Sequence, residues 1–537
     1  MQNCHFDLCS KVHTFKLGIP FILMLCFVTG ILNPDAFATA LDDYVAVYDA
    51  NFSYIEKSRS FDLGTLTRGY ILEMTSQGWR NTNEVEPVIW KHWVTVVVPE
   101  WDWLLGATQD TAIVIISDGN TTDPEPLASE IDPNYRDIAA GTRSVVVELS
   151  GVPNQPLRFA DEDVNRIEDE IIAYSWDKFL NGGDDFWPVL LPMVKSVVRC
   201  MDTVQDFVGN YAANTKTINY FVLTGGSKRG WTAWLAAAVD LRVIAIAPIV
   251  SDLLNMRRSF AHHWAAYGFW ADALEPYEQM GIFDWLDTPE ANELLEIVDP
   301  FEYQNRLDIP KYIINAAGDN FFVMDSIRFY FSQLQGETYL RHVPNTDHYL
   351  TGAFEDVYSS MIPYYDAFLY GDARPQFSWT FEEDGSIRVQ TVDTPKDVNL
   401  VQASNLTSRD FRLGTIGASW VDTDLYDSGG GVYVGHINEP NTGWTAFFVE
   451  LVFESPFQGT DAFDYVFTTE MRVLPEILPY EGDFDRDRIT DANDLKILSD
   501  VWLSENVYRD IAPRMSGDGI VNLEDFSVFA MHWLEGG

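Results

Sequence analysis

Short runs of apolar, largely β-branched residues recur along the N-terminal part of this chain and constrain its fold more than any other feature. They are apolar throughout, whereas a strand with one face in water alternates between apolar and polar residues. Continuously apolar strands are buried on both faces, which is typical of a parallel sheet covered by helices. Helical segments separate them, so we predict an α/β domain over residues 41–370. The runs span residues 93–99, 112–117, 144–149, 217–224, 242–250 and 310–316.

The pattern changes near residue 371. Residues 377–474 contain short strand-like segments and turns with little helical periodicity, including a predicted hairpin around Asp384-Gly385. We therefore expect a small antiparallel β domain over residues 371–476.

The C-terminal segment, residues 481–537, contains a weak internal repeat. Asp494 and Trp502 match Asp525 and Trp533 at an offset of 31 residues. Two copies of one loop–helix unit explain this periodicity.

The N-terminus has the pattern of a signal peptide. Lys11 and Lys16 precede an apolar run over residues 17–32, and small residues follow at Ala36, Ala38 and Ala40. We expect cleavage of residues 1–40 and a secreted, cell-surface or periplasmic protein that does not contact the membrane afterwards. An uncleaved membrane anchor is the alternative, although the run is short for a bilayer span.

Charge and cysteine content exclude several classes of partner and site. The net charge of −46 repels nucleic acid and anionic membranes. Three of the four cysteines lie in the predicted signal peptide, so only Cys200 remains in the mature chain. This excludes an intrachain disulfide or a cysteine metal site there, and we expect Cys200 to be a buried core thiol.

The run at 217–224 leads into the sequence Gly225-Gly-Ser227-Lys-Arg-Gly230, and residues 228–239 then have an alanine-rich helical pattern. A strand, a tight turn carrying serine and a helix form the nucleophile elbow of α/β-hydrolases. At a helix start the dipole also favours developing negative charge. The usual motif is Gly-x-Ser-x-Gly, and Arg229 stands in place of its second glycine. A serine that merely caps the helix is the alternative.

Candidate partners for Ser227 follow it in the order serine, acid, histidine that α/β-hydrolases use. Asp319 comes after a predicted strand at 312–315, and His348 after one at 339–343. His348 would accept the serine proton, and Asp319 would orient the imidazole. Alternatives remain at both positions. Asp325 and Asp347 are rival acids, His342 is a rival base, and His262 and His263 are expected to line or cover the site.

We expect the oxyanion of such a reaction to be held by two backbone N–H groups. One follows the nucleophile, at Lys228, and the other comes from the loop at residues 117–120, where Gly119 permits close approach. This chemistry needs no cofactor.

Near the C-terminus, oxygen-bearing residues follow the spacing of an EF-hand calcium loop. Arg488 replaces the usual glycine at position 6, and position 12 is Asp rather than Glu. We predict a structural calcium ion here, with a solvated acidic loop as the alternative. Positions 1, 3, 5, 9 and 12 are Asp483, Asp485, Asp487, Asp491 and Asp494, and Ile489 offers its carbonyl at position 7.

The second copy keeps Asp518, Asn522 and Asp525, whereas counting back from Asp525 puts Arg514 and Ser516 at positions 1 and 3. On this alignment we expect calcium to be weak or absent there.

Two such loops, each followed by a short helix, resemble a type I dockerin, in which Asp at position 12 is usual. The resemblance implies a cohesin-type partner when calcium is bound.

Residues 43–475 resemble the PhoPQ-activated pathogenicity-related protein family. The similar segments lie at 187–193, 225–231, 318–322, 344–348, 409–412 and 443–450. The resemblance implies an α/β-hydrolase fold with a C-terminal β domain, and Ser227, Asp319 and His348 match the family's triad positions.

Our first functional hypothesis is therefore a secreted serine hydrolase that cleaves an ester or a peptide or other amide bond through an acyl-enzyme. The alternative is a non-catalytic binding or attachment protein that uses the β domain and the C-terminal module, because a fold alone does not establish chemistry.

Overall fold

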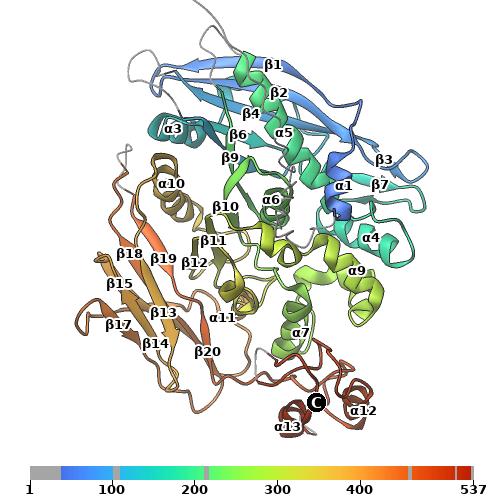
Figure 1. Ribbon diagram of the computed structural model, residues 1–537, viewed down its shortest axis with the longest axis vertical. Helices are drawn as coiled ribbons and strands as arrows, with labels where there is room; N and C mark the ends of the chain where they lie inside the picture. The colour runs from blue at the N-terminus through green and yellow to red at the C-terminus, as the bar shows by residue number, and fades with distance from the viewer. Residues whose placement is uncertain (1–37, 101–108, 211–216, 458–462, 514–516, 534–537) are drawn as a thin grey trace, which may run out of the picture. The chain divides into compact units, whose positions relative to one another are not determined.

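The largest sheet contains nine strands in the order β1-β2-β4-β6-β5-β9-β10-β11-β12 (Figure 1). Strands β1, β2 and β4 pair antiparallel, β4 is antiparallel to β6, and the remaining pairs are parallel. In chain order the strands are β1 Ser53–Asp62, β2 Thr67–Gly78, β4 Ile89–Pro99, β5 Thr111–Ile116, β6 Val145–Leu149, β9 Tyr220–Gly226, β10 Val243–Ile249, β11 Lys311–Ala316 and β12 Thr338–Val343.

This order is that of the α/β-hydrolase fold, with β1 added at one edge and β4 as the antiparallel second strand of the fold. The predicted fold class is thus confirmed for the hydrolase part. The parallel pairing expected for the run at 93–99 is wrong, because this run lies in β4, which pairs antiparallel with both neighbours. Its residues are continuously apolar because helices cover both faces of the sheet.

The computed structural model describes residues 38–100, 109–210, 217–457, 463–513 and 517–533. Nearly all of the predicted signal peptide, residues 1–37, lies outside the described residues. Within them, no helix combines the length and apolar character needed to cross a membrane. Cys200 is buried on α5, as predicted.

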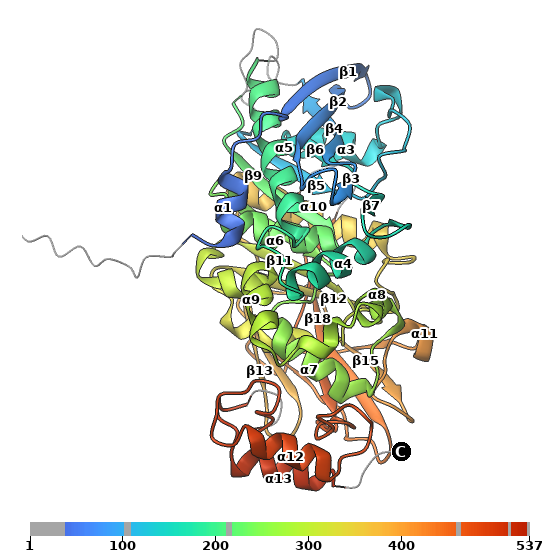
Figure 2. The same cartoon turned by 90° about the vertical axis from the view of Figure 1, so that its right-hand side faces the viewer.

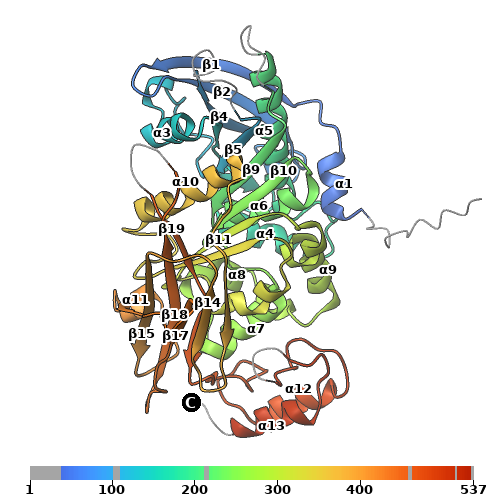
Figure 3. The same cartoon turned by 60° about the vertical axis from the view of Figure 1, so that its left-hand side comes forward.

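Helices cover the sheet on both faces (Figure 3). On one face α1, α5 and α6 pack together, and on the other α3 packs against α10. Alternate residues of each central strand enter the two cores, for example Val96 towards α5 and Val97 towards α3. These helices are α1 Ala40–Ala46, α3 Pro133–Thr142, α5 Leu190–Asn210, α6 Lys228–Val239 and α10 Phe354–Tyr370.

Between β10 and β11 the chain adds α7 Met256–Tyr267, α8 Glu275–Gln279 and α9 Pro289–Val298. Before them come α4 Asp169–Leu180 and a small sheet of β3 Val85–Glu86, β7 Leu157–Phe159 and β8 Asn165–Arg166. Helix α4 contacts both α8 and α9. These helices lie beyond the carboxyl ends of the strands, where α/β folds bind their ligands.

Two further antiparallel sheets follow α10. One has the order β13-β14-β17, and in the other β16, β15, β18 and β19 lie side by side while β20 also pairs with β18. Strand β19 packs on β12, and one apolar cluster joins both regions, so these strands extend the hydrolase core. The elements are β13 Phe377–Phe381, β14 Ile387–Thr391, β15 Asp397–Asn405, α11 Leu413–Ile416, β16 Val421–Asp424, β17 Val432–Gly435, β18 Trp444–Phe453, β19 Tyr465–Thr468 and β20 Arg472–Leu474.

The last two helices are α12 Ala492–Asp500 and α13 Leu523–Met531, each opened by a capping box after a loop (Figure 2). The loops contact α7: the Tyr480 N–H donates to the Ala265 carbonyl, and the Trp264 indole N–H donates to Asp483. Residues 39–537 form one compact unit. The domain boundaries near residues 370 and 476–481 therefore stay predictions.

Candidate active site

Ser227 lies between the end of β9 and the start of α6, with φ 57° and ψ −128°. A side-chain-bearing residue rarely adopts a positive φ, so the backbone is strained at this residue. Two glycines permit the turn. A Cβ on Gly225 would lie 2.9 Å from the Arg229 Cβ, and one on Gly230 would lie 2.8 Å from the Gly225 carbonyl oxygen and 2.9 Å from the Ser251 Cβ. Strand and helix can approach this closely only without those Cβ atoms.

Arg229 replaces the second glycine of the usual motif, and its side chain extends from the turn to Glu168 and the Val152 carbonyl. Its Nη1 and Nη2 donate to the two Glu168 carboxylate oxygens at 2.7 and 2.6 Å, and its Nε donates to the Val152 carbonyl at 2.6 Å. Burial raises the pKa of Glu168, but the hydrogen bonds from Arg229 and the charge of Lys228 outweigh it and lower that pKa to about 2. Gly230, one residue later, provides the close contact instead.

The structure brings together the three residues predicted to act with one another. The Nε2 atom of His348 lies 2.7 Å from the Ser227 Oγ, and its Nδ1 lies 2.8 Å from the Asp319 Oδ2. The other carboxylate oxygen of Asp319 accepts the N–H groups of Phe321 at 2.7 Å and Phe322 at 3.3 Å. Asp319 and His348 are buried. A fixed carboxylate therefore holds an imidazole against the serine hydroxyl.

The rival acid Asp325 belongs to a separate buried cluster. Its oxygens lie 2.9 Å from the His262 Nε2 and 2.6 Å from the Arg409 Nη2, and all three side chains are buried. Burial disfavours the charged carboxylate, but the nearby Arg409 guanidinium outweighs this effect and holds the pKa of Asp325 well below its usual range. Asp325 thus pairs with a structural arginine, in contact with His262 rather than His348.

Among the residues that the structure describes, the other two alternatives, His342 and Asp347, do not contact Ser227 or His348 in the way a triad member would, and His263, expected to line or cover the site, has contacts elsewhere. His342 is buried within β12, where burial lowers its pKa to about 3, and within the described residues its ring nitrogens make no hydrogen bond. Asp347 accepts the backbone N–H groups of Tyr349 and Thr351 and so shapes the loop that carries His348. His263 accepts the Ala271 N–H and packs among aromatic rings.

Two backbone segments border Ser227 where an oxyanion would form. The Lys228 N–H is the first of α6, so it has no acceptor within the helix. The loop after β5 places Ser117 and Asp118 on the wall of the cleft beside Ser227. Gly119 has φ 134°, and a Cβ on it would lie 3.2 Å from the Gly151 nitrogen, so only glycine fits easily here.

Two cavities meet at Ser227. We call the first the apolar pocket; the space between its walls, including the part open to solvent, is about 690 Å³. The second, which we call the open cleft, measures about 1680 Å³ on the same basis and includes His348 in its wall. The apolar pocket is lined by Asp169, Trp176, Ser227, Lys228, Trp231, Leu253, Met256, Ser259, Phe260, Leu274, Tyr277, Phe321, Phe322 and Ser326.

The PhoPQ-activated pathogenicity-related protein family matches residues 41–412, which contain Ser227, Asp319 and His348. The chain belongs to this family. A relative named autocrine proliferation repressor protein A, from Dictyostelium discoideum, is 37% identical over 482 residues, covering 86% of this chain and 94% of that protein.

Solved structures similar to this chain include two acetyl xylan esterases. The enzyme from a Thermoanaerobacterium species is 17% identical with a TM-score of 0.39, covering 62% of this chain and 91% of that one. The enzyme from a Paenibacillus species is 13% identical with a TM-score of 0.36, covering 59% and 91%.

The predicted calcium loop gathers part of its predicted ligand set. Ligand atoms of Asp483, Asp485 and Asp487 all lie within 4.8 Å of one another. The Asp494 carboxylate instead accepts the N–H groups of Phe484 and Asp485 on one oxygen and that of Asp491 on the other. Asp491 caps α12 by accepting the Asn493 N–H. The carbonyl of Ile489 stays a predicted ligand.

The second loop is longer than the sequence alignment predicted. Asp510 accepts the N–H groups of Asp518 and Gly519, as Asp483 accepts those of Asp487 and Arg488. Asp525 accepts the N–H groups of Ile511, Ala512 and Asn522, as Asp494 does in the first loop. Position 1 is therefore Asp510 rather than Arg514, which with Ser516 lies outside the described residues.

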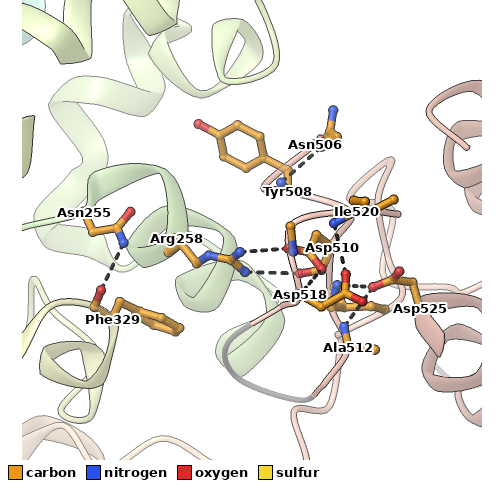
Figure 4. A network of polar contacts seen from close by, with 12 residues as sticks. Asn255, Arg258, Phe329, Asn506, Tyr508, Asp510, Ala512, Asp518, Ile520 and Asp525 are labelled. Atoms are coloured by element: carbon orange, nitrogen blue, oxygen red, sulfur yellow. Dashed lines mark hydrogen bonds and ion pairs between the residues drawn. The ribbon is translucent and has the colours of Figure 1, made fainter. Parts of the chain in front are cut away.

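Four extra residues caused the misalignment, because Asp510 precedes Asp525 by 15 residues and Asp483 precedes Asp494 by 11. Figure 4 shows Arg258 of α7 pointing at Asp510. Its Nη2 lies 2.9 Å from the Asp510 carboxylate, so an arginine neutralises this position.

Gly230→Ala is expected to lower the free energy of unfolding by about 1–3 kcal/mol, because the new Cβ overlaps atoms of β9 and of the segment after β10. Gly226→Ala is the matched control, since a Cβ there meets no atom within 4 Å. Thermal and urea denaturation of the two variants checks this. Equal stability would contradict the close strand–helix contact described above.

Proposed function

We propose that this protein is a serine hydrolase that cleaves an ester or amide bond through an acyl-enzyme, with Ser227 as nucleophile, His348 as base and Asp319 as the acid that orients it. The continuous contact from Ser227 Oγ through His348 to Asp319 is the observation that carries the proposal. The positive φ of Ser227 adds support, since strain of this kind clusters at functional sites.

In the first half-reaction the Ser227 Oγ attacks the substrate carbonyl carbon while its proton passes to the His348 Nε2. The carbonyl oxygen becomes an oxyanion, which would accept the Lys228 N–H and, from the loop at residues 117–120, the Gly119 N–H. When the intermediate collapses, the bond to the leaving group breaks and that group takes the proton from His348.

In the second half-reaction, water attacks the acyl-enzyme and gives its proton to His348. The ester bond to Ser227 breaks, Ser227 regains its proton, and the acid product leaves. Asp319 stays ionised and stabilises the imidazolium that forms in each half. The Phe321 ring lies 4.3 Å from the imidazole ring, centre to centre, and shields it from water.

A fluorophosphonate probe is expected to label the folded protein at Ser227, because the probe captures only serines activated by a neighbouring base. Ser227→Ala should abolish labelling while circular dichroism and melting temperature stay close to wild type. Folded wild-type protein that resists labelling would favour the non-catalytic alternative, and labelling that survives Ser227→Ala would identify another nucleophile.

Asp319→Asn and Asp325→Asn separate the two acids. Asp319→Asn is expected to lower kcat by about three to four orders of magnitude with little loss of stability, because the amide cannot hold the required imidazole tautomer. Asp325→Asn leaves the buried Arg409 without its counter-charge and should cost about 3–5 kcal/mol of unfolding free energy. Stopped-flow turnover and urea denaturation of both variants test this. The reverse pattern would make Asp325 the catalytic acid.

We also propose that residues 481–537 form a dockerin-like module that holds a structural calcium ion. The donor set suits the ion, since calcium prefers several carboxylate oxygens. Burial raises the pKa of Asp485, and the neighbouring charges of Asp494 and Asp487 raise it further. A cation among these groups would relieve that repulsion, with Asp483, Asp485 and Asp487 as its first ligands.

A cohesin-type partner is part of this proposal, and the surface of the module supports it. Large apolar side chains are exposed on both repeats, and two pairs, Ile489 with Ile520 and Trp502 with Trp533, recur at the offset of 31 residues. Exposed apolar side chains are typical of interaction sites when they form a patch. They are Ile489, Trp502, Leu503, Ile520, Leu523, Phe526, Met531 and Trp533. The signal-like N-terminus supports export of the whole protein to the cell surface, periplasm or medium.

Calorimetric titration of the full-length protein with calcium is expected to give a binding isotherm that Asp485→Ala weakens at least about tenfold, because a ligand is lost. Asp500→Ala removes the same charge from the exposed end of α12 and should bind as wild type. The wild-type protein is first freed of metal with a chelator. If calcium then gives no binding heat and does not raise the melting temperature, the calcium assignment is wrong.

A further inference from the structure

The two cavities at Ser227 differ in chemistry. The apolar pocket is walled mainly by tryptophan, phenylalanine, methionine and leucine side chains. The wall of the open cleft is mixed: apolar side chains such as Phe354 and Val357 lie beside polar ones such as Asp118 and Asn134. Both contain Ser227, Lys228, Asp169 and Phe321 in their walls, so a substrate bound at Ser227 can extend into both.

The position of His348 decides which half of the substrate each cavity receives. In the proposed reaction His348 protonates the leaving group, so that group must lie on the His348 side of the Ser227 Oγ. His348 lines the open cleft and is absent from the walls of the apolar pocket, which are formed by described residues. The apolar pocket therefore lies on the acyl side, and the open cleft on the leaving-group side.

We propose, on the basis of the function proposed above, that the substrates carry an apolar acyl group, either a medium-length alkyl chain or an aromatic ring, which binds in the apolar pocket. Large apolar side chains, among them Trp231, Leu253 and Phe260, line the apolar pocket. An alkyl chain or ring placed among them would remove its apolar surface from water, which favours its binding.

The floor of the pocket is held rigidly in shape. The indole N–H of Trp231 donates to the Val298 carbonyl at 2.6 Å, and the Trp176 ring packs edge-on against Trp231 with 5.9 Å between ring centres. Trp176 also packs against Tyr277 at 5.5 Å. Because these aromatic walls are already held in place, they need not reorganise when an apolar group binds, and this favours binding.

The charged groups at the pocket mouth are already paired. Lys228 Nζ lies 2.8 Å from both the Asp169 and the Glu168 carboxylates, and the Tyr277 hydroxyl donates to the other Asp169 oxygen at 3.0 Å. An acyl group ending in a carboxylate would be desolvated among aromatic rings without a free counter-charge. The pocket therefore selects against charged acyl groups.

Ser259 of α7 gives a way to test the pocket. Its side chain lines the pocket, and a phenylalanine at this position would fill the space that a longer acyl chain needs. Ser359→Phe on α10 is the matched control. The Ser359 hydroxyl donates to the Glu355 carbonyl, as that of Ser259 donates to the Leu254 carbonyl, and Ser359 lines neither cavity.

The experiment compares kcat/KM for p-nitrophenyl acetate, hexanoate and hemisuccinate, which share one leaving group. Each fully buried methylene is worth about fourfold, so wild type is expected to prefer hexanoate to acetate at least tenfold, and to prefer it to hemisuccinate by more. Ser259→Phe should reduce the hexanoate preference to about twofold while acetate turnover stays within about threefold. Ser359→Phe should keep the wild-type profile.

Fluorophosphonate labelling of each variant separates the two proposals. The apolar acyl site is wrong if labelled wild-type protein prefers acetate or hemisuccinate, or hydrolyses none of the esters. In that case the labelling still supports Ser227 as the nucleophile. Equal loss of acetate and hexanoate turnover in labelled Ser259→Phe also overturns the apolar acyl site. If folded wild-type protein is not labelled, the proposed serine hydrolase function is wrong, and the inference of an apolar acyl site is wrong with it.

Discussion

The contact between the end of β9 and the first turn of α6 determines the geometry of everything around Ser227. Gly225 and Gly230 let the strand and helix approach more closely than Cβ atoms permit. Only Ser227 lies between the last residue of β9 and the first residue of α6. That residue takes a positive φ, which projects its hydroxyl beyond the sheet edge towards His348. The strain at Ser227 is offset by the packing of α6 on both β9 and β10.

Charge pairing is a second condition for this arrangement. Lys228 and Arg229 directly follow Ser227 and are buried, and Glu168 and Asp169 supply the compensating charges. Without those carboxylates, two cations would be desolvated beside Ser227. Because both cations are neutralised, the electrostatic field at Ser227 comes mainly from the helix dipole and the backbone N–H groups. Arg229 thus occupies the glycine position of the usual motif without disturbing the turn.

Sequence reasoning located Ser227, Asp319 and His348 because this fold fixes their order and places each after a strand, and strands that are apolar throughout are easy to recognise. It could not separate Asp319 from Asp325, since the difference lies in Arg409, distant in sequence, which pairs with Asp325. Strand β1 was missed because it alternates between exposed and half-buried residues at the sheet edge. Asp510 was missed because a fixed offset cannot detect an insertion, whereas its hydrogen bonds identify it directly.

Helix α7 serves two regions of the molecule. Met256, Ser259 and Phe260 form part of the apolar pocket, while Arg258 and Trp264 bind Asp510 and Asp483, the first residues of the two C-terminal loops. Through these contacts, one helix joins residues 481–537 to the wall of the apolar pocket. A chain truncated before residue 481 would leave the guanidinium of Arg258 and the indole N–H of Trp264 without these partners, on the helix that walls the pocket. A change in residues 481–537 can therefore act on the apolar pocket through α7, without touching Ser227.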